Sequence, residues 1–193
     1  MSARGVAVVV LGVVGGLGLM GPRLVSAGEK ASPAIQQHVQ TVIAKWGEDP
    51  IVVAAVRAQN ASHRSLKEIQ QLDAKWQSTP GMSDFMRGLV DSDCGQRLKQ
   101  LEAETGFYAE IFVTDNQGAN VCMSDKTSDY WQGDEDKFIK AFAGGQGAVF
   151  IDDVKFDESS QVYTVQASLP VVDGGRAIGT MTVGIDVDAF ERR

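Results

Sequence analysis

The feature that most constrains this chain is a change in hydrophobic period at residue 108. Before it, apolar residues recur every three or four positions, as in Ile35, Val39, Val42 and Trp46, and this spacing predicts amphipathic helices. After it, short apolar or alternating runs are separated by turns rich in Asp and Gly, which predicts strands. A helical half followed by consecutive strands is typical of an α+β domain.

The N-terminal half is predicted to form five helical segments, over residues 33–46, 51–59, 65–76, 85–90 and 95–104. Ser-Pro at position 32 and Asp-Pro at position 49 each place a capping side chain before a proline at the first helical position. Ser65 and Glu68 have the spacing of a capping box. We expect Trp46 and Trp76 to lie in the core.

The C-terminal half is predicted to form a five-stranded antiparallel sheet, with strands over residues 108–114, 119–124, 148–156, 162–170 and 177–187. A short helix over 134–143 crosses between the second and third strands. The first two strands form a hairpin around 115–118, so Asp115 is a turn residue and not a catalytic carboxylate. Without repeats or a second core, we expect one domain, helical over 32–105 and sheet over 107–188.

The first 27 residues have the pattern of a secretory signal peptide. Arg4 precedes an uncharged apolar run over 5–21, and Val25-Ser26-Ala27 is a small-x-small cleavage site. We therefore expect cleavage after Ala27 and a mature domain of 28–193 that is periplasmic or secreted. A retained N-terminal membrane anchor is the alternative.

The mature domain is acidic. The net charge of the whole chain is −7, and removing Arg4 and Arg23 with the leader lowers it by two, to −9. Nucleic acid and anionic lipid surfaces are therefore poor partners, and we predict no nucleic-acid binding. No apolar run in the mature part is long enough to cross a membrane.

The chain has two cysteines, Cys94 and Cys122. In an exported protein they could form a disulfide, whose loop would contribute about 3.5 kcal/mol. Cys94 follows Asp93 at a predicted helix start, so a reactive thiol is a second interpretation. Two unrelated buried thiols are a third, and spacing does not decide among the three.

The sequence lacks the common catalytic patterns, and we predict neither an enzyme nor a cofactor. The only histidines, His38 and His63, lie in or beside the predicted helices, and there is no Gly-x-Ser-x-Gly turn, phosphate-binding glycine loop or haem-attachment motif. A thiol catalyst formed by Cys94 or Cys122 with His63 is a remote alternative. Five acidic residues could supply calcium ligands, but their spacing does not match an EF-hand, so we predict no metal site: Asp125, Asp129, Asp134, Glu135 and Asp136.

The segment after the hairpin has the composition of a lid over a small-molecule pocket. Tyr130 and Trp131 can supply flat apolar walls, and Ser124, Lys137 and Gln166 can supply directional hydrogen bonds. In the alternative interpretation, Tyr130 or Trp131 plugs the sheet and Lys137 lies along it.

The order of elements and several motifs together resemble the extracytoplasmic PAS-like sensor domains called Cache, or PDC, domains. The resemblance covers most of the mature chain and rests on "DPIVVAAVRAQN", "LKEIQQLDAKWQ", "AEIFVTDNQGANVCMSDKTSDYWQGDEDKFIKAF" and "GAVFIDDVKFDESSQVYTVQASLPVVDGGRAIGTMTVGIDV". It implies a PAS-like fold in which a long N-terminal helical segment backs the five-stranded sheet. A small organic ligand, such as a carboxylate, an amine or an amino acid, would then lie between the other face of the sheet and residues 125–138.

The same resemblance implies the ligand-binding residues. Lys137 would face an anionic group, Tyr130 and Trp131 would enclose the ligand, and Asp186 would pair with an amine. The full set of candidates is Ser124, Tyr130, Trp131, Lys137, Tyr163, Gln166 and Asp186. Amino-acid-sensing members carry an arginine with Trp and Tyr on the crossover, whereas this chain has Asp136-Lys137-Phe138, so that ligand class does not follow.

The resemblance also implies a role in signal transduction or chemoreception. Because no second apolar segment or output domain follows Arg193, we expect a stand-alone sensor that signals by contact with a membrane histidine kinase or chemoreceptor. The alternative is a structural module with the same fold and no ligand. Its single apolar stripe over 33–46 would form a homodimer with the same helix of another copy.

Overall fold

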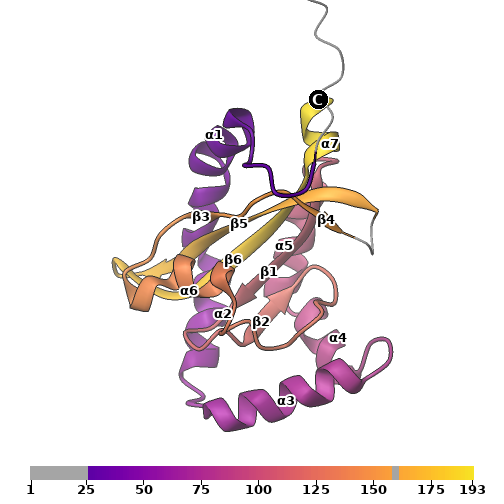
Figure 1. Cartoon of the computed structure of the whole chain (residues 1–193). Helices are drawn as coiled ribbons and strands as arrows, with labels where there is room; N and C mark the ends of the chain where they lie inside the picture. The colour runs from indigo at the N-terminus through magenta and orange to yellow at the C-terminus, as the bar shows by residue number, and fades with distance from the viewer. Residues whose placement is uncertain (1–25, 158–160) are drawn as a thin grey trace, which may run out of the picture.

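An antiparallel sheet crosses the middle of this computed structural model, which describes residues 26–157 and 161–193 (Figure 1). Among these residues the sheet has six strands in the order β2-β1-β6-β5-β3, and β4 also pairs with β5. The strands are β1 (Tyr108–Thr114), β2 (Asn120–Met123), β3 (Phe150–Ile151), β4 (Lys155–Asp157), β5 (Val162–Asp173) and β6 (Arg176–Asp186). The predicted α+β class is therefore confirmed.

The helices begin where the sequence places capping residues. Ser32 Oγ accepts a hydrogen bond from Ile35 N, Asp49 caps the next helix, and Ser65 forms the expected capping box with Glu68. The helices are α1 (Pro33–Thr41), α2 (Pro50–Asn60), α3 (Leu66–Ser78), α4 (Asp84–Asp91), α5 (Asp93–Ala103), α6 (Asp136–Phe142) and α7 (Val187–Glu191), with 3-10 turns η1 (Ile43–Glu48) and η2 (Ala143–Gly145). The predicted helix over 33–46 thus ends as α1 and continues as η1.

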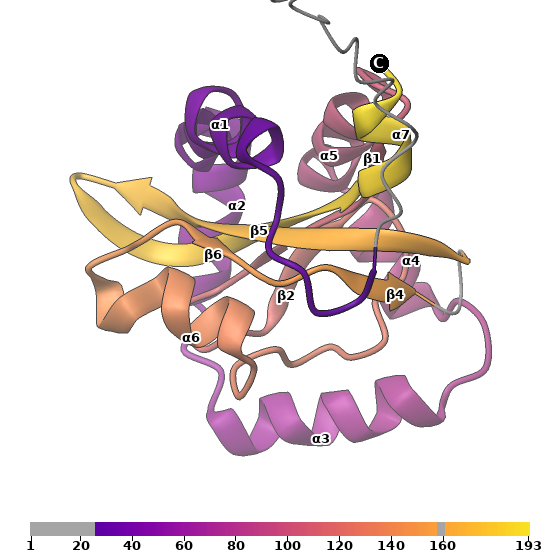
Figure 2. The ribbon, with the colours of Figure 1, turned by 45° about the horizontal axis from the view of Figure 1, so that its top comes forward.

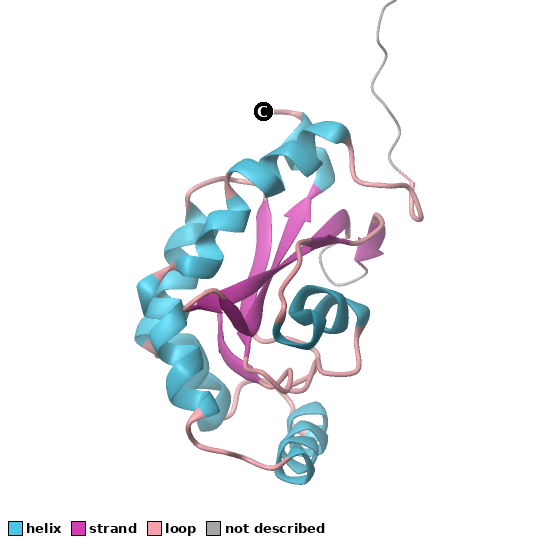
Figure 3. Cartoon of the chain, turned by 90° about the vertical axis from the view of Figure 1, so that its left-hand side faces the viewer, coloured by secondary structure: helices cyan, strands magenta, loops and turns pink. Residues whose placement is uncertain are grey.

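The two faces of the sheet are covered by different helices. Figure 2 shows α1, α5 and α7 on one side and α6 and α3 on the other, and Figure 3 shows the strands between a long row of helices and shorter ones. On β5, Val165, Ala167 and Leu169 belong to the large apolar core with α1, α2 and α5. Because side chains alternate along a strand, Gln166 and Ser168 point to the opposite side. We call these sides the helix-covered face and the distal face.

The apolar stripe of α1 lies inside the protein. Ile35, Val39 and Ile43 are each completely buried in the core of the helix-covered face. The side chains expected to form a seam between two copies are therefore used within one chain, and Val42 is the large apolar residue of this segment that stays exposed. A homodimer would have to be built from other residues.

A disulfide joins α5 to the sheet. Cys94 and Cys122 are bonded, are both buried, and are 28 positions apart in the sequence. Neither is available as a reactive thiol in this state. The bond lies in the core of the helix-covered face.

The predicted third strand, 148–156, is divided. Asp152 N still donates to Gln166 O on β5, but Val154 N donates to Glu29 O and Val154 O accepts from Gly28 N. The N-terminal segment thus takes over the backbone partners at this point, so β3 and β4 are two short strands and the sheet has six strands rather than five. Residues 1–25 of the predicted signal peptide lie outside the described residues. In the described part of the chain, no helix combines the length and apolarity needed to cross a membrane.

Candidate ligand site

The aromatic part of the predicted lid is filled by the protein itself. Tyr130 is completely buried, with its ring centroid 5.6 Å from that of Trp76 on α3 and 5.4 Å from that of Phe85 on α4. Its hydroxyl accepts a hydrogen bond from Arg64 at 2.7 Å. Burial raises the pKa of Tyr130 to about 12, so the hydroxyl stays neutral. Tyr130 acts here as a plug, the alternative interpretation of this residue.

Trp131 and Lys137 are also engaged within the chain. Trp131 Nε1 donates to Gln117 O at 2.8 Å. Lys137 Nζ pairs with Glu135 Oε2 at 3.0 Å and lies 5.3 Å from the ring centroid of Phe112, with 12% of its side chain exposed. The charge of Lys137 is therefore already compensated, and Lys137 does not line the hollow over Glu110 described next.

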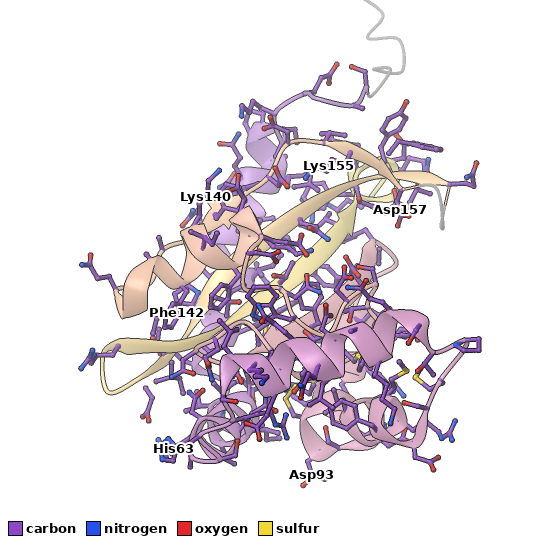
Figure 4. The ribbon with its side chains drawn as sticks, turned by 60° about the horizontal axis from the view of Figure 1, so that its bottom comes forward. His63, Asp93, Lys140, Phe142, Lys155 and Asp157 are labelled. Atoms are coloured by element: carbon purple, nitrogen blue, oxygen red, sulfur yellow. A yellow bond between two sulfur atoms is a disulfide. The ribbon has the colours of Figure 1, made fainter. Side chains whose placement is uncertain are left out.

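A separate hollow of about 310 Å³ remains on the distal face. Its floor is formed by Glu110 on β1 and by Thr164 and Gln166 on β5, and its walls by the loop 126–128 and by residues of 152–157. Figure 4 looks toward this side of the molecule, and it labels Lys155 and Asp157 on β4 and Lys140 and Phe142 on α6. The hollow is large enough for about ten water-sized groups, so it suits a small organic molecule.

The floor of this hollow depends on a glycine. Gly184 on β6 is opposite Glu110 on β1 and opposite Gln166 on β5, so the three residues form a row across three strands. A Cβ on Gly184 would lie 2.8 Å from Glu110 Cγ, closer than side chains tolerate. Because that space is free, the side chains of Glu110 and Gln166 meet above the glycine, and Gln166 Nε2 donates to Glu110 Oε1 at 2.8 Å.

The lysines of the walls are already engaged. Lys126 Nζ donates to the carbonyl oxygens of Thr79 at 3.1 Å and Gly81 at 2.9 Å. Lys155 Nζ pairs with Asp152 Oδ2 at 2.6 Å. Partial burial favours the neutral form of Asp152, but hydrogen bonds from Lys155 and from the Asp153 backbone lower its pKa overall. Lys155 and Asp152 are therefore both ionised, and each neutralises the charge of the other.

One of the seven predicted ligand residues, Gln166, lines this hollow. Tyr163 packs against the core of the helix-covered face, because it is three positions from Gln166 and alternate residues face opposite sides. Ser124 Oγ accepts a hydrogen bond from Ile111 N and links β2 to β1, and Asp186 caps α7 by accepting from Ala189 N. The structure thus brings neither Ser124, Tyr163 nor Asp186 to the hollow.

Sequence reasoning missed Glu110 and Thr164. Glu110 lies across β6 from Gln166, and Thr164 lies two positions from Gln166 on β5, so parity places both on the same face of the sheet as Gln166. The available signal for Glu110 was a carboxylate in the middle of the otherwise uncharged strand 108–114. A charge in a central strand usually needs a partner or a function, and this expectation could have identified it.

Three of the five acidic residues considered for calcium have local side-chain partners. Asp136 pairs with Lys140 and Glu135 with Lys137, while Asp129 Oδ2 accepts from Ser128 Oγ at 2.7 Å. Within residues 26–157 and 161–193, no group of three His, Cys, Asp or Glu side chains is arranged to hold a metal ion.

Larger hollows occur elsewhere on the surface. A groove of about 900 Å³ lies between α2 and α5 above Cys94 and Val121, and one of about 760 Å³ lies between α4, α5 and Tyr108. Both are wide and shallow, whereas the hollow over Glu110 is more enclosed and has converging polar groups. Convergent polar groups in an enclosed space are typical of small-molecule sites, so we take the Glu110 hollow as the candidate site.

Neither a protein-family model nor a curated protein sequence matches this chain. Solved structures do. The chain is similar to the sensor domain of the V. cholerae histidine kinase DctB, with 15% identity and a TM-score of 0.40, over 82% of this chain and 55% of that one. It is also similar to the ligand-binding domain of the Campylobacter jejuni chemoreceptor Tlp3 in complex with 4-methylisoleucine, with 14% identity and a TM-score of 0.40, over 78% and 62%.

A third similar structure is an extracellular ligand binding receptor from Desulfohalobium retbaense, with 18% identity and a TM-score of 0.40, over 74% of this chain and 25% of that one. This chain therefore spans between a quarter and two thirds of the length of the three structures. The three structures are a sensor domain, a ligand-binding domain and a ligand binding receptor.

Proposed function

We propose that this protein is an exported Cache-type sensor domain that binds a small organic ligand in the hollow over Glu110 and Gln166. The observation that carries the proposal is the hollow itself, a partly enclosed space of about 310 Å³ on the distal face with converging polar side chains. This is the face on which the sequence resemblance places a ligand. The bound state would be passed by contact to a partner such as a histidine kinase or a chemoreceptor.

The wall of the hollow is connected to the start of the chain. Lys30 Nζ pairs with Asp153 Oδ1 at 2.6 Å, and Val154 N donates to Glu29 O at 2.7 Å. In Figure 2 the indigo start of the described chain passes beside β4 before it enters α1. If the wall has two conformations and the ligand binds one of them more tightly, ligand binding would also shift the segment before α1, which is hydrogen-bonded to the wall. That segment is therefore the proposed route to a partner.

Two features support export. The buried Cys94–Cys122 disulfide is typical of proteins that fold in an oxidising compartment. Ser26 contacts Glu29, three residues further on, whereas Gly28 N donates to Val154 O across the fold. A cut after Ala27 would leave the hydrogen bond between Gly28 and Val154 in place. We propose that residues 1–27 are the leader and that 28–193 is the sensor domain.

A thermal-shift screen tests the binding proposal. Amines, carboxylates and amino acids at millimolar concentration should include compounds that raise the Tm, because a ligand that binds only the folded state stabilises it. Thr164→Phe, which fills the hollow, should abolish every such shift, while the matched control Thr164→Ser should keep them. The proposal fails if no compound raises the Tm, or if the hits survive Thr164→Phe.

A further inference from the structure

We infer that the hollow over Glu110 binds a primary ammonium group, so that the ligand is an amine rather than a carboxylate. This inference rests on the proposed function and specifies the ligand class for the same site. It follows from three properties of the hollow: the charge of its floor, the hydrogen-bond acceptors beside that charge, and the state of the nearby lysines.

The charge on the floor is the carboxylate of Glu110. Glu110 Oε1 accepts a hydrogen bond from Gln166 Nε2, and within the described residues Glu110 forms no ion pair. Glu110 is half-buried in the central part of the sheet, on a strand paired on both sides. A partly buried carboxylate is stabilised by a cation, and a ligand ammonium would supply the cation that the chain does not.

The groups beside this carboxylate are hydrogen-bond acceptors. Gln166 uses its amide N–H toward Glu110, which leaves its carbonyl oxygen as an acceptor. Thr164 lies two positions along β5 on the same face, and its hydroxyl has no hydrogen bond with the described residues. An ammonium has three N–H donors, and Glu110 Oε2, the Gln166 carbonyl and the Thr164 hydroxyl are three acceptors around one hollow.

The nearby lysines give an anionic ligand little support. Lys126 is held by two backbone carbonyls, and Lys155 by Asp152. Lys137, which the sequence suggested as the partner of an anion, is paired with Glu135 over the ring of Phe112. A carboxylate in the hollow would face Glu110 without a free cation from these three residues, and like charges at close range repel.

Calorimetry with matched probes tests this inference. The probes are n-butylamine, 1,4-diaminobutane and 2-phenylethylamine, each compared with a carboxylate of similar length: pentanoate, adipate and 3-phenylpropanoate. At least one amine should bind, and its matched carboxylate should not. The N,N,N-trimethyl form of the binding amine keeps the charge but has no N–H donors, so it should bind at least about tenfold more weakly.

Two variants locate the binding amine. Glu110→Gln keeps the shape of the side chain but removes its charge, and it should weaken amine binding by about ten- to a hundredfold. Gly184→Ala places a methyl group against Glu110 Cγ and should weaken binding in the same direction. Gly106→Ala is the control, because a methyl group there meets nothing within 4 Å. Circular dichroism of each variant shows whether the fold is retained.

The possible failures are distinguishable. If carboxylates bind and amines do not, or if Glu110→Gln binds the amine as well as the native protein, the ammonium assignment is overturned. The binding proposal then still stands if Thr164→Phe abolishes the binding that is observed. If neither these probes nor any compound of the wider screen binds, both the assignment and the proposed function fail.

Discussion

The two faces of the sheet are built from alternate residues of the same strands, yet they differ in almost every physical property. On the helix-covered face, β5 contributes Val165, Ala167 and Leu169 to a closed apolar core. On the distal face, the same strand contributes Gln166 to the hollow and Ser168 to a buried hydroxyl pair with Thr182. Residues that build the apolar core and residues that face the candidate site therefore alternate along one strand.

The distal face itself is divided. At the end near β2, Tyr130, Trp76 and Phe85 fill the space with aromatic rings in mutual contact. Over Glu110 and Gln166 the space stays open. The helices α3 and α4 supply two of the three rings, so they close one part of the face and leave the other part accessible.

The largest expected effect is the loss of apolar packing on the helix-covered face. Leu169 is completely buried, so Leu169→Ala should lower the free energy of unfolding by about 4 kcal/mol. Gln166→Ala, on the other face of the same strand, should lower it by about 1 kcal/mol, since it removes one partly exposed hydrogen bond. Urea unfolding measures both changes. Equal losses of unfolding free energy in the two variants would contradict the expected difference between the two faces.

Reduction of the disulfide should have the next largest effect. Cys94 and Cys122 are 28 positions apart, and breaking the bond between them should lower the free energy of unfolding by about 3.5 kcal/mol, because the unfolded chain regains conformational entropy. The measurement is urea unfolding with and without a reductant. The double variant Cys94→Ala/Cys122→Ala is the control, and its stability should not respond to the reductant. Ligand binding on the distal face should persist after reduction, and its loss would show that the faces are coupled.

A smaller effect is expected for the hydroxyl pair on the distal face. Ser168 Oγ and Thr182 Oγ1 are 2.9 Å apart and both residues are buried. Thr182→Val leaves the Ser168 hydroxyl without this partner and should lower the free energy of unfolding by about 1–2 kcal/mol. Adding Ser168→Ala should restore part of the loss, since no unpaired group then remains. A purely additive double-mutant cycle would contradict this interaction.

The smallest expected effect concerns pH and the helix-covered face. Burial, and next the charge of Arg193, lowers the pKa of His38 from its ordinary value of 6.5. The unfolded chain therefore takes up a proton that the folded chain resists, and the free energy of unfolding should fall as the pH drops below about 6.5. Thermal unfolding between pH 7 and pH 5.5 should show a shallower slope in His38→Gln. His63→Gln, which changes the chain's other histidine, should keep the native slope.

Much of the fold could be predicted because its signals are local. The caps at Ser32, Asp49 and Ser65 fix helix starts through hydrogen bonds within three residues. At the hairpin, Asp115 Oδ1 accepts from Gln117 N and Ala119 N, and Gly118 adopts a φ of 84°, which favours glycine. The division of the third predicted strand could not be found this way, because it depends on pairing with residues 28–30.

The candidate site was predicted less well, for physical reasons that differ between residues. A lid and a plug both need a large flat side chain, so the sequence could not decide the role of Tyr130. The buried position of Tyr130 depends on packing against Trp76 of α3, which is distant in the sequence. Tyr163 could have been separated from Gln166 by parity alone, since residues three apart on a strand face opposite sides. Glu110 was identifiable as a charge within a strand, but its partner across β6 depends on register.

The polar floor of the hollow depends in part on the absence of a side chain at Gly184. Gly184 has no Cβ, so the Glu110 carboxylate on β1 and the Gln166 amide on β5 can form a hydrogen bond above it, although β1 and β5 are not neighbouring strands. Gly184→Ala would therefore displace the Glu110 side chain without replacing any of the polar groups that line the hollow. Other chains in which a carboxylate, a glycine and an amide lie in one row across three strands are therefore the natural place to test whether the same row forms a similar hollow.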